Sequence, residues 1–205
     1  MTHSIARQSR SHFRGAPWAA LALAAALVAC NELPKQRGQK VATTSNAALE
    51  KKNPIDVVVA PVVDASTIKS RTEVPLADLR EAFQKGLVRR RYSPLALDYV
   101  DKKVVEAAYP IGALKEEAVL QVTIESWDAT LLDTRGALIT RVRARLLDAV
   151  DPGRAQLWQG TIDHRFDFEG QRDKFNSRAA FTDYICDRIA EEVLAALPPR
   201  AGAGG

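Results

Sequence analysis

The side chains with the widest chemical scope in this chain are Cys30, Cys186 and His164. A cysteine thiol can act as a nucleophile, bind a metal or take a covalent attachment, and a histidine can bind a metal or transfer a proton. Cys30 ends an apolar stretch, Leu21 to Ala29, and polar residues follow it at once. The other two histidines precede that stretch, so His164 is the only one after it. The setting of Cys30 therefore decides which of these chemistries is open to the chain.

The first 29 residues have the organisation of an export signal. Arg7, Arg10 and Arg14 come first, and no Asp or Glu occurs before residue 30. The apolar run that follows, from Ala16 to Ala29, is shorter than the roughly 20 residues of a membrane-spanning helix. The pattern predicts a signal peptide over residues 1–29 and not a retained transmembrane helix.

The tetrapeptide Leu27-Val28-Ala29-Cys30 resembles a bacterial lipobox. The resemblance implies a diacylglyceryl thioether on the Cys30 sulfur, cleavage before Cys30 and acylation of the new amino terminus. The alternative is cleavage after Ala26, which satisfies the A-x-A rule through Ala24 and leaves Cys30 a free thiol. Each buried methylene adds about 0.8 kcal/mol of membrane affinity, so several acyl chains give a stable anchor. By analogy with other bacterial lipoproteins, Asn31 favours the outer membrane, with the protein facing the periplasm.

Composition argues against several classes of function. Without residues 1–29 the chain carries 26 basic and 25 acidic side chains, a net charge of +1 in place of +4, which gives no reason to expect nucleic acid. A single histidine argues against a multi-histidine metal site, and Cys186, on the apolar stripe of a predicted helix, is expected to be a small buried hydrophobe. The chain has no G-x-S-x-G, phosphate-loop, dinucleotide-fingerprint, H-E-x-x-H or C-x-x-C motif. We therefore expect no enzyme, no metal and no cofactor.

Four segments follow from the sequence. Residues 1–29 form the signal, and residues 30–53 form the lipidated amino terminus and a polar, flexible spacer. Residues 54–197 form one α/β domain, and residues 198–205, rich in Pro, Gly and Ala, form a disordered tail.

The α/β domain is expected to begin with a βαβ unit. Residues 55–60 are continuously apolar, which is typical of a buried strand, and a helix begins at Pro75, where proline is tolerated in a first turn. Residues 92–101 read as a turn and a second, parallel strand, followed by a short helix over 102–108. Asp98 and Asp101 lie at the mouth of this crossover, where α/β proteins often bind ligands, although a helix-cap and turn role is the alternative.

Three strands with alternating apolar and polar residues follow, over residues 118–125, 138–146 and 158–168. Consecutive strands with one apolar and one charged face predict an antiparallel meander. A final helix is expected from an N-cap at Ser177 to Pro198. The fold class is therefore α/β (α+β): a single domain with a mixed sheet, a βαβ start, a three-stranded meander and helices packed on one face.

Arg141, Arg143 and Arg145 occupy the charged face of the middle meander strand. Glu125, Asp163 and Asp167 are predicted on the matching faces of the flanking strands, where cross-strand pairs contribute about 0.2 to 1 kcal/mol each. A paired, solvated sheet face is favoured over a binding platform, but these arginines, with Asp98 and Asp101, remain the candidate partner or ligand surface.

The body of the chain, over roughly residues 55 to 170, resembles a family of small bacterial envelope lipoproteins. This family includes the neisserial surface lipoprotein group and, more distantly, the curli-secretion lipoprotein and the amino-terminal domain of the Tol translocation protein. The likeness rests on Val57 to Pro61, Gly86-Leu87, Arg91-Tyr92, Pro94, Ala118 to Val122, Trp127, Leu147-Asp148 and Leu157-Trp158-Gln159-Gly160. It implies an α/β domain used for docking and not for catalysis. One departure is Asp64-Ala65-Ser66, where the neisserial group typically has Asn-Ser.

We expect an outer-membrane lipoprotein that serves as a docking or accessory module of an envelope transport or secretion assembly. Its partners would be the membrane, through the acyl chains on Cys30, and an envelope protein, with self-association left open. The alternative is an auxiliary subunit of a lipid-trafficking transporter that binds an apolar ligand between helix and sheet. A deep apolar pocket of at least about 300 Å³ would favour this alternative, whereas a closed core with an exposed apolar patch would favour docking.

Overall fold

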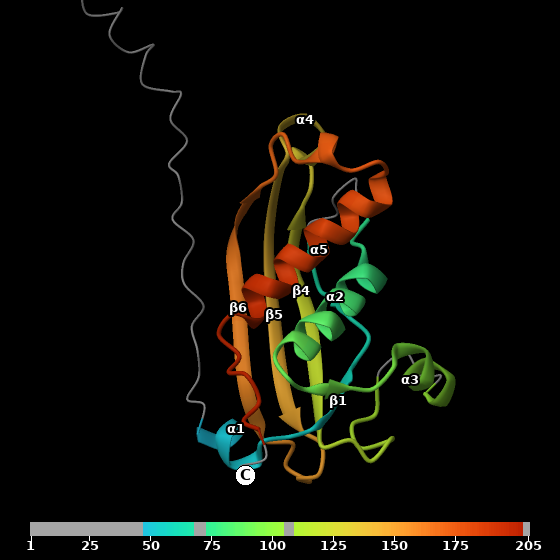
Figure 1. The fold of residues 1–205 in the computed structure, drawn as a ribbon, viewed down its shortest axis with the longest axis vertical. Helices are drawn as coiled ribbons and strands as arrows, with labels where there is room; N and C mark the ends of the chain where they lie inside the picture. Colours follow the sequence, from blue (N-terminus) through green and yellow to red (C-terminus); the bar gives the residue numbers. More distant parts are fainter. Residues whose placement is uncertain (1–46, 68–72, 105–108, 203–205) are drawn as a thin grey trace, which may run out of the picture. The chain divides into compact units, whose positions relative to one another are not determined.

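One mixed sheet, with the strand order β3-β1-β4-β5-β6 and β2 as a further partner of β4, organises the molecule (Figure 1). The structure is a computed structural model and describes residues 47–67, 73–104 and 109–202. The strands are β1 (Asp56–Val59), β2 (Val63–Asp64), β3 (Ser93–Pro94), β4 (Ala118–Asp128), β5 (Ala137–Asp148) and β6 (Gln156–Asp167). The helices are α1 (Ala47–Lys52), α2 (Leu76–Arg89), α3 (Leu97–Lys103), α4 (Leu132–Arg135) and α5 (Arg178–Leu194), with a 3₁₀ turn, η1, at Arg172–Lys174.

The predicted βαβ start is confirmed. β1 pairs in parallel with β3 after the α2 crossover, and it also pairs in parallel with β4. Val57, Val58 and Val59 are fully buried, as a strand covered on both faces requires. β2 pairs in parallel with β4 farther along; both of its residues are exposed, and the sequence did not predict this strand.

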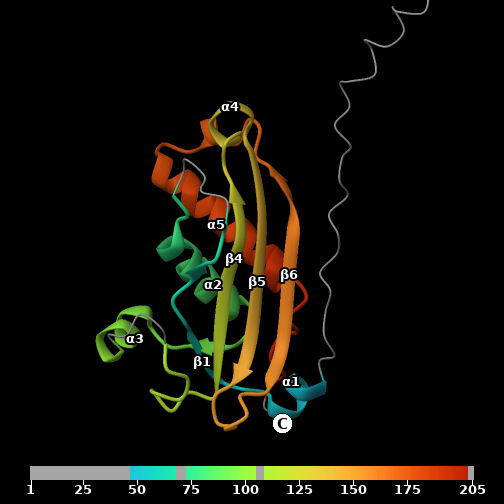
Figure 2. The ribbon, with the colours of Figure 1, turned by 180° about the vertical axis from the view of Figure 1, so that it is seen from behind.

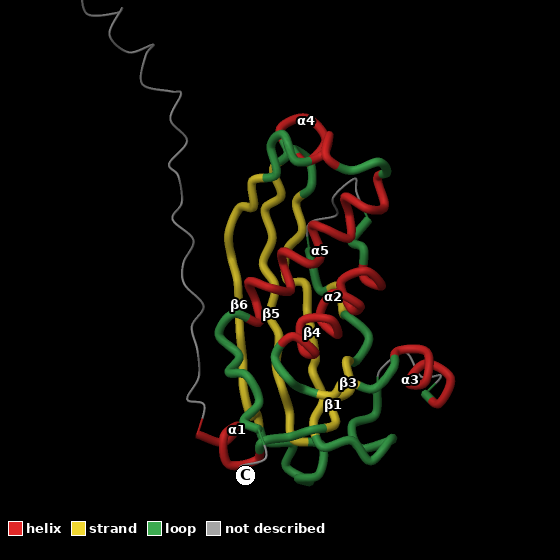
Figure 3. Tube along the Cα trace, viewed as in Figure 1, coloured by secondary structure: helices red, strands yellow, loops and turns green. Residues whose placement is uncertain are grey.

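The predicted antiparallel meander is also confirmed, because β4 pairs with β5 and β5 pairs with β6 over nearly their full lengths. A register shift between Ile124 and Ser126 places Trp127 on the buried side of the sheet near the end of β4. The short helix α4, which the sequence did not predict, joins β4 to β5 (Figure 3). It ends at Gly136, which has the left-handed φ of +62° that favours glycine.

The two long helices, α2 and α5, pack against each other and against the same face of the sheet (Figure 1). Their apolar residues and those of β4 to β6 form the main hydrophobic core. Ser177 caps α5 as predicted, since its Oγ accepts a hydrogen bond of 3.1 Å from the N–H of Ala180. Cys186 is fully buried on the inner side of α5, and burial raises the pKa of its thiol well above the usual range.

The opposite face of the sheet is divided between a covered part and an open part (Figure 2). Val100 of α3 packs with Val58 and Val119 in a second, smaller core under β1 and β4. The expectation that helices lie on one face therefore holds for α2 and α5 but not for α3. The remaining outer face, on β4 to β6, carries the alternating polar side chains.

The predicted second strand of the βαβ unit is shorter than expected, because residues 97–103 are helical. Apolar residues at every second position, Leu95, Leu97 and Tyr99, imitate a strand, but Tyr99 is 47% exposed. The buried face instead rests on Val100 and Val104, which are four residues apart as on a helix. Of the helix predicted over 102–108, residues 105–108 lie outside the described part of the chain.

The described part of the chain shows folded structure on both sides of the predicted domain limits, 54 and 197. In α1, inside the range predicted as spacer, Leu49 is buried in the main core, and Nζ of Lys52 lies 3.0 Å from Oδ1 of Asp148. After residue 197, the carbonyl of Pro198 accepts a hydrogen bond from Tyr92, and the N–H of Arg200 donates to Arg90. The ordered domain thus begins before residue 54 and includes the first residues of the predicted tail.

Candidate functional site

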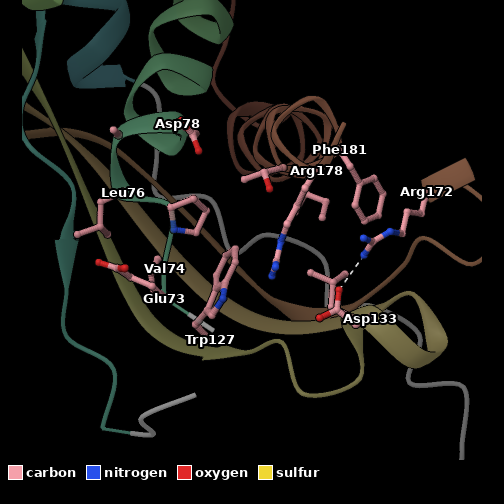
Figure 4. Close-up of a pocket in the computed structure, with 14 residues that line it drawn as sticks. Glu73, Val74, Leu76, Asp78, Trp127, Asp133, Arg172, Arg178 and Phe181 are labelled. Atoms are coloured by element: carbon pink, nitrogen blue, oxygen red, sulfur yellow. Dashed lines mark hydrogen bonds and ion pairs between the residues drawn. The ribbon is translucent and has the colours of Figure 1, made fainter. Parts of the chain in front are cut away.

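A pocket of about 600 Å³ lies where α2 and α5 both begin and where β4 ends (Figure 4). The segment before α2 and the first turn of that helix form one wall, the first two turns of α5 form another, and Trp127 and α4 complete it. Its apolar lining comes from Val74, Pro75, Leu76, Trp127, Leu132, Phe181 and Ile185. Its charged lining comes from Glu73, Asp78, Asp133, Arg172 and Arg178.

Local sequence signals explain why both helices start at this place. Pro75 precedes α2 and supplies the fixed φ of a helix start, and no side chain caps the first N–H groups of that helix. Ser177 starts α5. Because the amino-terminal ends of both helices lie at the pocket, the partial positive charge of two helix dipoles is directed towards it.

Trp127 is the most buried polar side chain of the pocket. It is 2% exposed, and its Nε1–H has no hydrogen-bond acceptor in the part of the chain that the structure describes. By contrast, the indole of Trp158, which is also buried, donates from Nε1 to the carbonyl of Ala196 at 3.3 Å. Five buried side-chain atoms lack a hydrogen-bond partner in the described residues, and Nε1 of Trp127 is the one among them that belongs to a residue lining this pocket.

The two arginines of the pocket differ in their surroundings. Arg172 of η1 forms an ion pair of 2.8 Å with Asp133 of α4 across the rim. Arg178, the first residue of α5, forms no ion pair or side-chain hydrogen bond within the described ranges. Figure 4 shows its guanidinium group projecting towards the same space as the indole of Trp127. Both arginines also line a smaller adjoining pocket of about 400 Å³, which includes Asn176 and Ser177.

The acidic residue of the pocket with a perturbed pKa is Asp78, in the first turn of α2. Burial raises its pKa above the usual range, and the nearby carboxylates of Asp183 and Glu81 raise it further. The cavity therefore has the carboxyl group of Asp78 on its α2 side and the guanidinium group of Arg178, which has no ion pair in the described ranges, on its α5 side.

The comparisons with known proteins find structural neighbours only, since no protein-family profile and no curated protein sequence matches the chain. A variant of PelC from Paraburkholderia phytofirmans, solved as a dodecamer, matches with a TM-score of 0.50 and 18% identity over 80% of this chain and 99% of PelC. This chain shares its fold with PelC. A second PelC dodecamer from that organism matches over the same shares of both chains, with a TM-score of 0.49 and 15% identity.

Another similar structure is lipoprotein GNA1162 from Neisseria meningitidis, which matches with a TM-score of 0.43 and 14% identity over 70% of this chain and 99% of that one. A neisserial lipoprotein is thus among the similar structures, although the likeness is weak. At these identities the comparisons describe a fold and assign no activity.

The predicted arginine surface is a paired, solvated face of the sheet. Arg141 pairs with Asp163 and Arg143 pairs with Glu125, while Nη2 of Arg145 donates to Oε1 of Gln121 at 3.2 Å. The favoured interpretation of these residues is therefore confirmed in its geometry, except that Asp167 lies opposite Ala137 and the partner of Arg145 is Gln121 of β4. Whether this face also binds a partner stays a prediction.

Asp98 and Asp101 do not line either of the pockets described above. Asp98 is exposed in the first turn of α3 but does not cap that helix, because the N-cap position is Ala96 and no side chain accepts a capping hydrogen bond there. Asp101 lies 2.6 Å from Nη1 of the buried Arg80, whose Nε donates to the carbonyl of Val59. Asp101 thus helps to attach α3 to α2 and β1.

The remaining predictions concern Cys30, which lies outside the described residues, and metal binding. Across residues 47–67, 73–104 and 109–202, no group of three or more His, Cys, Asp or Glu side chains is arranged to hold a metal ion. In the same ranges, no helix has the length and apolar content needed to cross a membrane. His164 lies on β6, and its Nε2 is 3.0 Å from a carboxylate oxygen of Glu192 on α5.

Sequence reasoning did not find the pocket. Trp127 was noticed only as the end of a strand motif, and Arg172 and Arg178 carried no signal, because they belong to a loop and a helix start far from Trp127 in sequence. The one local hint was the presence of two helix starts, at Pro75 and Ser177. That they lie at the same cavity follows from the packing of α2 against α5.

Proposed function

We propose that the chain is an acylated outer-membrane lipoprotein that faces the periplasm and works as a non-catalytic accessory module of an envelope transport or secretion assembly. The observation that carries this proposal is the tetrapeptide Leu27-Val28-Ala29-Cys30 at the end of a complete export signal. Acyl chains on Cys30 would hold the folded domain at the membrane surface and raise its effective concentration for a partner there. The charged outer face of β4 to β6 is the surface that we assign to docking.

Self-association is part of the same proposal. The PelC structures that share this fold hold dodecamers, which supports assembly as one use of the fold. β6 is the last strand of the sheet order, so one of its edges has no strand partner among the described residues. Exposed edges of this kind are a common route to contacts between chains.

The anchor is tested by changing each of the two cysteines of the chain in turn. The parent and Cys186→Ala should incorporate an alkyne-labelled fatty acid and fractionate with membranes. Cys30→Ser should do neither, because it lacks the sulfur that would carry the diacylglyceryl group. A Cys30→Ser protein that still sediments with membranes as the parent does would contradict the proposal.

A second function is favoured by the pocket, which we propose to bind an apolar ligand in the way that an auxiliary subunit of a lipid-trafficking transporter would. Its volume of about 600 Å³ lies within the range of ligand sites, and most of its lining residues are apolar. A cavity-filling variant, Leu132→Trp, should abolish binding of a neutral apolar fluorophore while leaving the unfolding transition in place. Binding that persists in this variant would place the fluorophore elsewhere.

A further inference from the structure

The pocket combines a long apolar wall with two polar groups that lack partners. Trp127 is almost fully buried and presents an Nε1–H without an acceptor in the described part of the chain. Arg178 presents a guanidinium group without an ion pair in that part, at the first residue of a helix of 17 residues. The side chains of both residues line the same cavity and project towards the same space in Figure 4.

These two groups favour an anionic oxygen. An indole N–H can only donate a hydrogen bond, and a guanidinium group donates best to a carboxylate or a phosphate. The first turn of α5 adds backbone N–H groups and the positive end of the helix dipole. The polar pocket that adjoins Arg178 offers room for a head group outside the apolar cavity.

The carboxylates of the pocket do not occupy this position. Asp133 is engaged with Arg172 at 2.8 Å. Asp78 and Glu73 belong to the α2 side, opposite to Arg178 on α5. The cavity is therefore polarised, with its uncompensated positive charge on the α5 side.

We propose that this pocket binds a single-chain anionic amphiphile, with the apolar chain between α2, α5 and β4 and the acidic group between Arg178 and Nε1 of Trp127. The shared chemistry is one acyl chain that carries an acid, whether a free fatty acid or a monoacyl phospholipid. The inference rests on the second of the two proposed functions and adds the head group that the pocket selects.

The test uses the full chain with Cys30→Ser, so that acyl chains of the protein itself do not compete. Fluorescence of dansyl-labelled undecanoic acid reports binding, and laurate, dodecanol and lauroyl lysophosphatidylglycerol serve as competitors. We expect laurate to compete about tenfold better than dodecanol, because a charge-assisted hydrogen bond is worth that factor or more. Of the two acids, the stronger competitor identifies the source: laurate for a free fatty acid, the lysolipid for a membrane phospholipid.

Four variants locate the acid. Arg178→Gln should remove most of the advantage of laurate over dodecanol and leave the affinity for dodecanol unchanged. Arg135 is an exposed residue of α4 that does not line the pocket, so Arg135→Gln should change neither affinity. Trp127→Phe keeps an aromatic ring but loses the N–H, and should weaken laurate about fivefold. Asp78→Asn should increase the affinity for laurate a few fold, because it removes an ionisable acid from the cavity.

The outcomes separate the inference from the function on which it rests. Equal competition by laurate and dodecanol in the parent, or an advantage of laurate that survives Arg178→Gln, would overturn the inference and leave an apolar-ligand pocket. A parent chain that binds none of the competitors, or probe binding that survives Leu132→Trp, would overturn both. Circular dichroism of each variant shows whether the fold is intact. Arg178→Lys keeps the positive charge and should therefore keep the preference for laurate; loss of the preference in a folded Arg178→Lys would contradict the inference.

Discussion

Gly160 shows how one missing side chain fixes the packing of a helix on the sheet. A Cβ at this position would lie 2.6 Å from Cη2 and Cζ2 of Trp158 and 2.8 Å from the carbonyl oxygen of Val193. Trp158 is fully buried, and its Nε1 donates to the carbonyl of Ala196 just after α5. The Leu-Trp-x-Gly pattern that carried part of the sequence resemblance is therefore a packing device that brings α5 close to β6.

Gly160→Ala should lower the free energy of unfolding by about 2 to 3 kcal/mol, because neither the indole nor the backbone of α5 can move away cheaply. Gly86→Ala is the matched control. There the new methyl group would lie 2.5 Å from Cδ1 of Leu194, at the end of a side chain, and 3.9 Å from its Cγ, without contacting backbone of another element, and the helix gains propensity worth up to about 1 kcal/mol. Urea unfolding followed by circular dichroism measures both. Equal losses in the two variants would show that the close approach at Gly160 is not what limits substitution.

Asp148 is the residue from which we predict a pH dependence. Burial alone would raise its pKa, but hydrogen bonds from Lys52 and from the N–H groups of Val150 and Asp151 outweigh that effect and lower the pKa below the usual range. The ionised form is therefore the one that the fold stabilises. Its contribution is present above about pH 4 and is lost as the pH falls through the lowered pKa of the folded state.

Asp148→Asn should cost on the order of 1 kcal/mol of unfolding free energy at neutral pH and nothing once the parent carboxylate is protonated. The measurement is urea unfolding of parent and variant at neutral pH and between about pH 4 and pH 2. Lys52→Met should reproduce part of the loss at neutral pH, since it removes one of the three donors. A difference between parent and Asp148→Asn that stays constant down to the lowest pH would contradict this account.

At the scale of elements, α1 is the helix whose role the structure changes most. The sequence placed it in a spacer, but Leu49 is 3% exposed and packs in the main core. The short length of α1 and its charged residues hid this contact, because a single buried residue leaves no periodic pattern.

Leu49→Ala should lower the free energy of unfolding by about 2 to 4 kcal/mol if α1 is part of the domain. Lys51→Ala, on the exposed side of the same helix, should stay within about 0.5 kcal/mol of the parent. Thermal or urea unfolding distinguishes the two. If Leu49→Ala left the free energy of unfolding unchanged, α1 would belong to the spacer and not to the domain.

The elements that could be predicted from sequence are those with a sustained period. The alternation in β4 to β6, and the three-to-four spacing with clear start signals in α2 and α5, each extend over 11 or more residues. α3 was assigned wrongly in part, because three alternate apolar residues imitate a strand and the deciding contacts of Val100 are with β1 and β4. Burial of Arg80 between Val59 and Asp101 is likewise a tertiary effect that no local pattern encodes.

The candidate pocket could not be predicted for a related reason. Its walls come from three segments that are far apart in sequence, residues 73–78, 127–133 and 172–185. The bulge after Ile124 turns Trp127 inward, and the sequence shows no glycine or proline that would mark it. Arg178 lines the pocket only because the first turn of α5 lies beside the first turn of α2.

At the scale of the whole molecule, the two candidate binding regions lie on opposite faces of the sheet. The arginines of β5 alternate with residues that are buried in the core under α2 and α5, whereas the pocket lies on the helix side, so a docked partner and a bound ligand need not exclude each other. This arrangement is consistent with a tethered domain that carries a ligand while it contacts an envelope protein.

Self-association is predicted from the edge of β6 that has no strand partner among the described residues, next to the charged outer face of β4 to β6. We expect light scattering of the acylated chain in detergent to give a protein mass that is a multiple of the single chain. The triple variant Arg141→Gln, Arg143→Gln, Arg145→Gln should fold with similar stability, because exposed pairs contribute at most about 1 kcal/mol each. It should assemble less well if this face lies in the contact. A parent chain that stays monomeric at all concentrations would contradict self-association, and unchanged assembly of the triple variant would move the contact to another surface.

The most direct test of the whole account is the chemical state of Cys30 in the exported protein. Mass spectrometry of the amino-terminal peptide should show a chain that begins at Cys30, with a diacylglyceryl group on the sulfur and an acyl group on the amino terminus. A peptide that begins at Leu27 and holds an unmodified Cys30 thiol would show cleavage after Ala26, and the tethering mechanism proposed for this protein would then be wrong.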